Sequence, residues 1–199
     1  MTTTGLLGLL RGAAEGSAPA FLSLHESAAG LGRLRYVEVG FFERVGRRAA
    51  SLQPPQVAIW ADSAARAAAW RASLLGELLP VSVGLPAAAE LTRSAGAAVD
   101  LALDRLGPPE DETRLFPPSR QRPAMQAVPS RPAGEVLDGP ALVAHVASSF
   151  YPALLGAYEG RRAMDSAAAD PPVRRVLARV IADLHAELNS ASDIAENWL

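Results

Sequence analysis

The chain has 199 residues, of which 49% are apolar and only 6% aromatic, and its formal net charge is −2. This balance provides no basic field for nucleic acid or an anionic membrane surface, so neither is an expected partner. The chain contains no cysteine, which excludes a disulfide framework and a Cys-based zinc site, and its excess of alanine and leucine over β-branched residues favours helices.

Proline and glycine divide the chain into helical segments. Pro54-Pro55 ends the first helical pattern and Pro80 ends the second. Gly139-Pro140 precedes a fourth segment, and Asp170 is placed to cap the fifth, with proline behind it. The expected elements, in chain order, are helices near 31–52 and 56–79, a shorter helix near 87–106, an irregular crossover over 107–138, and helices near 140–165 and 171–198.

We expect a single helical domain over 1–199, because neither half has enough helices to bury its apolar faces alone. It would consist of a helical hairpin at 21–79, the short helix 87–106, the crossover 107–138 and a second hairpin at 139–199. Two hairpins joined by one long crossover is the connectivity of an all-α, ferritin-like up-down four-helix bundle. The alternative is that the Pro- and Arg-rich crossover links two separate domains.

Helical periodicity places charged residues on faces that should be buried. Glu38 lies in the middle of the apolar stripe of the first long helix, and Glu187 in the middle of that of the last. Asp183 lies at the edge of the latter stripe, and Arg71 is on the buried side of the second helix. We expect these four residues to form a buried charge cluster, since a carboxylate is costly to bury without a partner. In the alternative, both glutamates escape at the edges of their stripes and Arg71 extends to water.

In the cluster hypothesis, Arg71 is the counter-charge of Glu38, Glu187 or both, because a guanidinium can bond a carboxylate in a two-pronged way. The pKa of the paired acids should then lie below the ordinary value near 4. The same periodicity predicts the core positions Leu34, Phe41, Val45, Trp60, Leu74, Leu78, Val146, Phe150, Val180 and Leu184.

The residue types needed for the usual metal site are missing. A di-iron or di-manganese carboxylate bundle needs two Glu-x-x-His pairs. The three histidines, His25, His145 and His185, do not follow an acid by three positions. No nucleophile elbow or phosphate-binding loop occurs either, so we expect no cofactor, no metal and no catalytic residue.

The remaining basic residues are expected on solvated faces, because they are interspersed with acids. The arginine pairs assigned to solvated faces are Arg47-Arg48, Arg161-Arg162 and Arg174-Arg175.

No targeting signal is recognisable, and no stretch of the sequence approaches the roughly 18 apolar residues of a membrane span. We therefore expect a cytoplasmic protein.

The part of the chain between 31 and 79 resembles a group of small ferritin-like helical proteins. In that group, the pattern Leu-x-x-Leu-x-Tyr-Val-Glu precedes an aromatic-Glu pair, and a later helix ends in His-Ala-Trp-His-Ala-Glu-Leu-x-x-x-x-Leu-Pro. The corresponding strings here are LGRLRYVE at 31–38, FE at 42–43, AAWRASL at 68–74 and LLP at 78–80. The segment YPALLGAY at 151–158 is also similar to that group, as is the last helix.

The resemblance implies a ferritin-like bundle with Glu38 as an inherited carboxylate, but several family residues are replaced. The two histidines around the tryptophan are Ala68 and Arg71, and the following glutamate is Ser73. The acid cluster of the last helix is reduced to Asp183 and Glu187. The resemblance therefore indicates a member whose metal site has been dismantled.

Three functions remain open at this level. The first is a non-catalytic protein that acts by association, as a homodimer or with another partner. The second is an oxidoreductase or hydroxylase with an atypical carboxylate-rich di-metal site made of Glu38, Asp62, Asp183 and Glu187. The third is a small-molecule site between the helices, in the place a metal occupies in relatives.

Overall fold

The computed structural model describes residues 22–108, 136–165 and 171–198, with side chains as far as Asn197. Within these ranges the regular structure is helical and contains no strand, so the predicted all-α class is confirmed for this part of the chain. Residues 109–135 of the predicted crossover lie outside the described ranges, and so does the predicted cap Asp170.

The first hairpin consists of α2 (Leu24–Arg48), a 3-10 turn η1 (Ala49–Ser51) and α3 (Pro55–Glu77). Helix α2 begins before the predicted position 31 because Ser23 and Glu26 form a capping box. The Ser23 hydroxyl accepts from the Glu26 amide at 3.2 Å, and the Glu26 carboxylate accepts from the Ser23 amide at 2.9 Å. Proline in the first turn of α3 suits a position whose N–H would have no partner in the helix.

The second hairpin consists of α7 (Gly139–His145), a π-helical segment η2 (Val146–Phe150), α8 (Tyr151–Met164) and α9 (Pro171–Trp198). Helix α7 begins at the predicted Gly139-Pro140, and the Asp138 carboxylate caps it by accepting from the Ala141 amide at 3.0 Å. From α7 to α8 the chain forms one nearly continuous rod.

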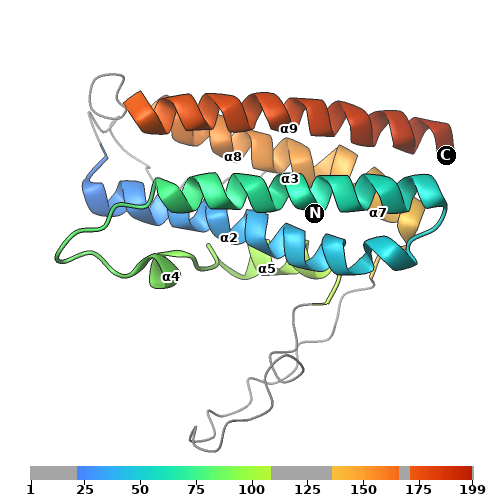
Figure 1. Ribbon diagram of the computed structural model, residues 1–199, viewed down its shortest axis with the longest axis horizontal. Helices are drawn as coiled ribbons and strands as arrows, with labels where there is room; N and C mark the ends of the chain where they lie inside the picture. Colours follow the sequence, from blue (N-terminus) through green and yellow to red (C-terminus); the bar gives the residue numbers. More distant parts are fainter. Residues whose placement is uncertain (1–21, 109–135, 166–170, 199) are drawn as a thin grey trace, which may run out of the picture.

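The long helices lie side by side along the length of the molecule (Figure 1). Helices α2 and α3 run in opposite directions, as do α8 and α9 (Figure 1). The segment that carries α4 and α5 returns along α2 to the end of the molecule where α3 began, so the α7–α8 rod runs in the same direction as α3 (Figure 1).

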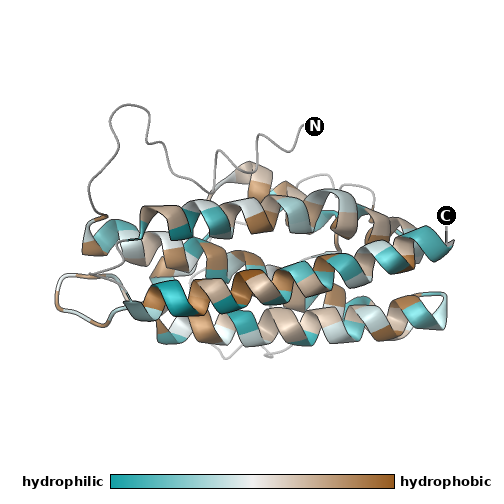
Figure 2. Ribbon diagram, turned by 90° about the horizontal axis from the view of Figure 1, so that it is seen from above, coloured by the Kyte–Doolittle hydropathy of each residue, from teal (hydrophilic) through white to brown (hydrophobic). Residues whose placement is uncertain are grey.

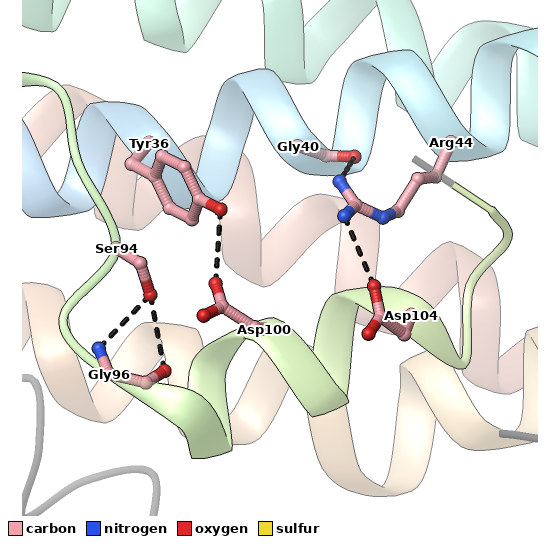
Figure 3. Close-up of polar contacts among 7 residues, drawn as sticks. All are labelled: Tyr36, Gly40, Arg44, Ser94, Gly96, Asp100 and Asp104. Carbon is pink, nitrogen blue, oxygen red and sulfur yellow. Dashed lines mark hydrogen bonds and ion pairs between the residues drawn. The ribbon is translucent and has the colours of Figure 1, made fainter. Parts of the chain in front are cut away.

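The short helix predicted over 87–106 is two helices, α4 (Ala88–Leu91) and α5 (Ala97–Asp104). The break occurs at Gly96, whose φ of +139° favours glycine. The Ser94 hydroxyl accepts from the Gly96 amide at 3.0 Å and donates to its carbonyl at 3.1 Å, which fixes this turn (Figure 3).

Polar side chains of α2 hold α5 in place (Figure 3). The Tyr36 hydroxyl donates to Asp100 at 3.0 Å, and the Arg44 guanidinium donates to Asp104 at 3.3 Å. Between them, Gly40 leaves room for Leu103, since a Cβ on Gly40 would lie 2.7 Å from a Leu103 methyl carbon. Tyr36, Gly40 and Arg44 are spaced four residues apart and therefore lie on one face of α2. This face contacts α5 and is more polar than the apolar stripe of α2.

The core contains the predicted Leu34, Phe41, Val45, Trp60, Val146, Phe150, Val180 and Leu184, all of which are buried. The predicted Leu74 and Leu78 are only half-buried, and their neighbours Leu75 and Leu79 are buried instead. The buried face of α3 carries a row of alanines and, at the end of the helix, is rotated from the predicted stripe toward Leu75 and Leu79. The alanines of the buried face of α3 are Ala61, Ala64, Ala65, Ala68 and Ala72.

The π-helical segment η2 joins α7 to α8 and ends at Phe150. Phe150 and the following Tyr151 are both buried. The Phe41 ring lies against both, with ring centroids 5.3 Å and 5.6 Å apart, respectively. Tyr151 thus lies inside the molecule, next to α2.

Apolar and polar residues alternate in bands along the helices, as expected when one side of each is buried (Figure 2).

Gly139–Met164 is the one stretch within the described ranges that is long and apolar enough to cross a membrane by length and composition. Just over half of its most apolar window, 56%, is buried inside the molecule, which is also the property of a core helix.

Candidate functional site

The structure brings Glu38 of α2 and Arg71 of α3 together in the interior. Both residues are 0% exposed, and the Arg71 Nε donates to the Glu38 Oε1 at 2.8 Å. The Tyr158 hydroxyl of α8 donates to the same oxygen, also at 2.8 Å. One carboxylate oxygen thus joins three helices.

Local sequence explains this meeting point. Glu38 lies between Leu34 and Phe41 on the apolar stripe of α2, so helical periodicity directs it inward. Arg71 lies between Ala68 and Ala72 on the buried face of α3, one turn before the buried Leu75.

Burial and charge act in opposite directions on Arg71. Burial is the largest single effect and lowers the pKa of this guanidinium, but the charge and hydrogen bond of Glu38, together with Tyr151 and Tyr158, outweigh it, so the pKa of Arg71 is above its ordinary value. Burial raises the pKa of Tyr158, and the Glu38 charge raises it further. Arg71 therefore stays charged and Tyr158 stays a hydrogen-bond donor throughout the physiological pH range.

Glu187 of α9 forms the outer end of the cluster. It is half-buried, and Tyr151 donates to its Oε2 at 3.5 Å, the long limit of a hydrogen bond. Burial raises the pKa of Glu187; the Arg71 charge and the Tyr151 hydroxyl oppose this rise, while the charges of Glu38 and Asp183 add to it. The lowered pKa predicted for acids paired with Arg71 is therefore wrong for Glu187, because burial outweighs the charge of Arg71, with which Glu187 forms no direct ion pair.

Burial also raises the pKa of Tyr151, and the positive charge of Arg71 only partly opposes the rise. Since Tyr151 contacts Glu187 and is influenced by Arg71, its ring lies between the two ends of the cluster. We refer to Glu38, Arg71, Tyr151, Tyr158 and Glu187 as the inner cluster.

The other predicted acids lie outside the inner cluster. Asp183 is partly exposed and accepts from Arg179 at 3.2 Å, while the Arg179 guanidinium lies 5.9 Å from the centre of the Trp70 ring. Asp62 is exposed and pairs with Arg66 on its own helix. The four acids of the di-metal alternative thus do not converge, and the described residues contain no group of three or more His, Cys, Asp or Glu that could hold a metal ion.

Three polar atoms of the inner cluster have no hydrogen-bond partner among the described residues: Glu38 Oε2 and both terminal nitrogens of Arg71, Nη1 and Nη2. The Nε–Oε1 bond is therefore a single contact rather than the predicted two-pronged one. The Tyr151 hydroxyl lies close enough to Arg71 for a hydrogen bond between them to lower the pKa of Tyr151.

The core positions predicted for the fourth helix are Val146 and Phe150, so the sequence prediction misses the buried Tyr151 and Tyr158. The seven-residue spacing of the two tyrosines is a usable signal, since it places both on one helix face.

The expectation of solvated arginine pairs is wrong for one member of each. Arg161 is buried, where it pairs with Asp165 and donates to the Ser27 hydroxyl at 2.7 Å. Arg48 donates to the Leu106 carbonyl at 2.6 Å and to the Leu137 carbonyl. Arg174 is also half-buried and donates to the Asp165 carbonyl at 2.8 Å. These residues join separate elements, which the presence of acids nearby in sequence does not reveal.

No protein-family model, curated protein or solved structure matches the chain. What the inner cluster does is therefore inferred from the contacts of its own residues.

Proposed function

We propose that the protein is a ferritin-like four-helix bundle in which Arg71 stands in the place of a metal ion, and that it acts by binding rather than by catalysis. The direction of the helices supports the ferritin-like part of the proposal, because two antiparallel hairpins are joined by one long connection that returns along α2 (Figure 1). The strings shared with small ferritin-like proteins are consistent with the same fold.

The observation that carries the proposal is the contact between Arg71 and Glu38 at 2.8 Å with both side chains fully buried. A buried carboxylate needs a counter-charge, which a metal ion supplies in metallo-bundles. Here the guanidinium supplies it from within the chain. Since Arg71 and Tyr158 both donate to Glu38 Oε1, a metal ion would have to compete with them for this oxygen.

Metal analysis tests this proposal. Purified protein is dialysed against a chelator and then titrated anaerobically with Mn²⁺ or Fe²⁺ while bound metal is measured by atomic emission. We expect far less than one metal ion per chain after a second dialysis. Near-stoichiometric iron or manganese that survives dialysis would contradict the proposal and favour the di-metal alternative.

Association with a second copy of the chain is the second candidate, and exposed apolar side chains favour it. Phe42 on α2 and Ile59 and Trp70 on α3 are large apolar residues that remain exposed. Sedimentation analysis of an Ile59→Arg variant tests this candidate, with Val83→Arg in the exposed 80–87 loop as the matched control. A concentration-dependent dimer that only the Ile59 variant weakens would support it, and a monomer at all concentrations would exclude it.

A further inference from the structure

A groove lies between α2 and α3 at the surface of the first hairpin, away from the inner cluster. It is lined by Phe42, Glu43, Gly46 and Arg47 of α2 and by Asp62, Ala65 and Arg66 of α3. Its volume is about 420 Å³. All of its lining residues except Ala65 are exposed or half-buried, so the groove is open to a partner from solvent.

Small residues form the floor of the groove, and an aromatic ring forms one wall. A Cβ on Gly46 would lie 3.3 Å from the Ala65 Cβ, so the two helices come close together at this point, which we call the floor contact. A carbon of the Phe42 ring lies 3.8 Å from the same Cβ position, and Phe42 is 43% exposed. The groove therefore presents apolar surface that a docked partner would remove from water.

The four charged side chains of the groove alternate in sign around the floor contact. Helices α2 and α3 run in opposite directions, so residues before the floor contact on α2 lie at the same end of the groove as residues after it on α3 (Figure 1). Glu43 and Arg66 therefore share one end, and Arg47 and Asp62 share the other. Each acid lies across the groove from an arginine and is followed by an arginine along its own helix.

This alternation makes the groove complementary to a copy of itself. A two-fold axis in the plane of the surface, whether it runs along the groove or across it, places each acid of one copy against an arginine of the other. With the axis along the groove, Glu43 faces Arg66 of the second copy. With the axis across the groove, Glu43 faces Arg47 instead. Such pairing of opposite charges selects the partner and fixes how the two copies align.

A second copy fits these charges better than a partner of one predominant charge. The groove carries two acids and two arginines, so an acidic or a basic peptide would meet as many like charges as opposite ones. Asp62 and Arg66 pair with each other along α3, and both side chains are largely exposed. Because an exposed pair contributes little to stability, these side chains can exchange each other for contacts with the second copy at little cost.

We propose that the groove between α2 and α3 is the interface of a symmetric homodimer, in which the acids of each copy pair with the arginines of the other and Phe42 is covered. This inference rests on the second candidate function, association with a second copy. It goes further by naming the surface and the charge pairs that select the partner.

Exchanging the charges of the groove tests this proposal. Glu43→Arg with Asp62→Arg makes the groove basic, and Arg47→Glu with Arg66→Glu makes it acidic. Sedimentation velocity over a range of concentrations gives the Kd of the dimer for the wild type, for each variant and for their equimolar mixture. We expect the wild type to dimerise and each variant alone to dimerise at least tenfold more weakly, because like charges meet. The mixture should recover at least the wild-type affinity.

Two further variants control for folding and for net charge. Asp193→Arg with Glu196→Arg makes the same change of charge as the basic variant, but at exposed positions of α9, and should dimerise like the wild type. If circular dichroism shows that the acidic variant does not fold, Arg66→Glu alone replaces it, since Arg66 is exposed and its partner Asp62 is on its own helix.

Three results would overturn the proposal. These are a wild-type monomer at all concentrations, groove variants that dimerise like the α9 control, or a mixture that stays monomeric. A wild-type monomer also excludes the second candidate function, whereas a dimer that the groove variants leave unchanged contradicts only the groove as its interface. Both differ from the failure of the first proposed function, which is stoichiometric metal binding in the separate metal titration.

Discussion

Replacing Arg71 by methionine should destabilise the protein strongly. The substitution keeps an unbranched apolar side chain but leaves Glu38 buried without its charged partner. Removing one member of a buried pair costs about 3–5 kcal/mol. Because Tyr158 still donates a hydrogen bond to Glu38 at 2.8 Å, we expect a loss in the lower part of that range, about 3 kcal/mol.

Urea unfolding followed by circular dichroism measures this loss as a difference in the free energy of unfolding. The matched control is Arg66→Met, which breaks the exposed pair with Asp62 and should cost about 0–1 kcal/mol.

The reasoning is refuted if Arg71→Met costs less than about 1 kcal/mol, the range of an exposed pair. Such a result would mean that water or another group solvates Glu38 without help from the arginine.

Three further perturbations test the packing and the electrostatics of the fold. Phe41→Ala should cost about 3–5 kcal/mol in urea unfolding, because the ring is fully buried against two aromatic neighbours; a loss under about 1 kcal/mol would contradict its orientation. Gly32→Ala should loosen the α4 segment, since the new Cβ would lie 2.2 Å from the Leu91 carbonyl oxygen, and amide hydrogen exchange should accelerate at 88–92. The control Gly30→Ala, whose Cβ would have ordinary contacts from 3.4 Å, should leave that exchange unchanged. Burial lowers the pKa of His145 in the folded protein. Its neutral form therefore contributes stability above the unfolded pKa of about 6.5, and this stability is lost as the pH falls below that value. His145→Gln should flatten the plot of stability against pH in this range, and an unchanged plot would show that His145 is not the group responsible.

Much of the helical architecture could be predicted because its signals are local. Prolines mark the starts and ends of the helical segments, and the periodicity of leucine and valine identifies them as helices. The predicted bounds of the two hairpins agree with the observed ones to within a few residues, apart from the start of α2. That start depends on the Ser23–Glu26 capping box, which is also local and was readable in the sequence.

The inner cluster could be predicted in part. Glu38 and Arg71 stand out because a charge in an apolar stripe is costly, and the structure places them in contact. Asp183 is a weaker case of a charge in an apolar stripe, since it lies at the edge of its stripe. There it pairs with Arg179.

The missed features depend on contacts between distant elements. The π-helical segment η2 departs from the regular helical period, and the contact between α5 and α2 needs Asp100 and Asp104 to meet residues of α2. Leu75 is buried in place of the predicted Leu74, which depends on how α3 is rotated against its neighbours. Tertiary packing thus decides helix rotation, whereas local sequence decides helix position.

The central claim is that Arg71 is the counter-charge of Glu38, and a double-mutant cycle tests it most directly. The cycle compares Arg71→Met, Glu38→Gln and the double variant by urea unfolding at neutral pH. The double variant leaves no buried charge at this position, so it should be more stable than the sum of the two single losses implies. We predict a coupling energy of about 2–3 kcal/mol, at the upper end of values for residues in contact. Additivity within about 0.5 kcal/mol, as for distant sites, would contradict the claim.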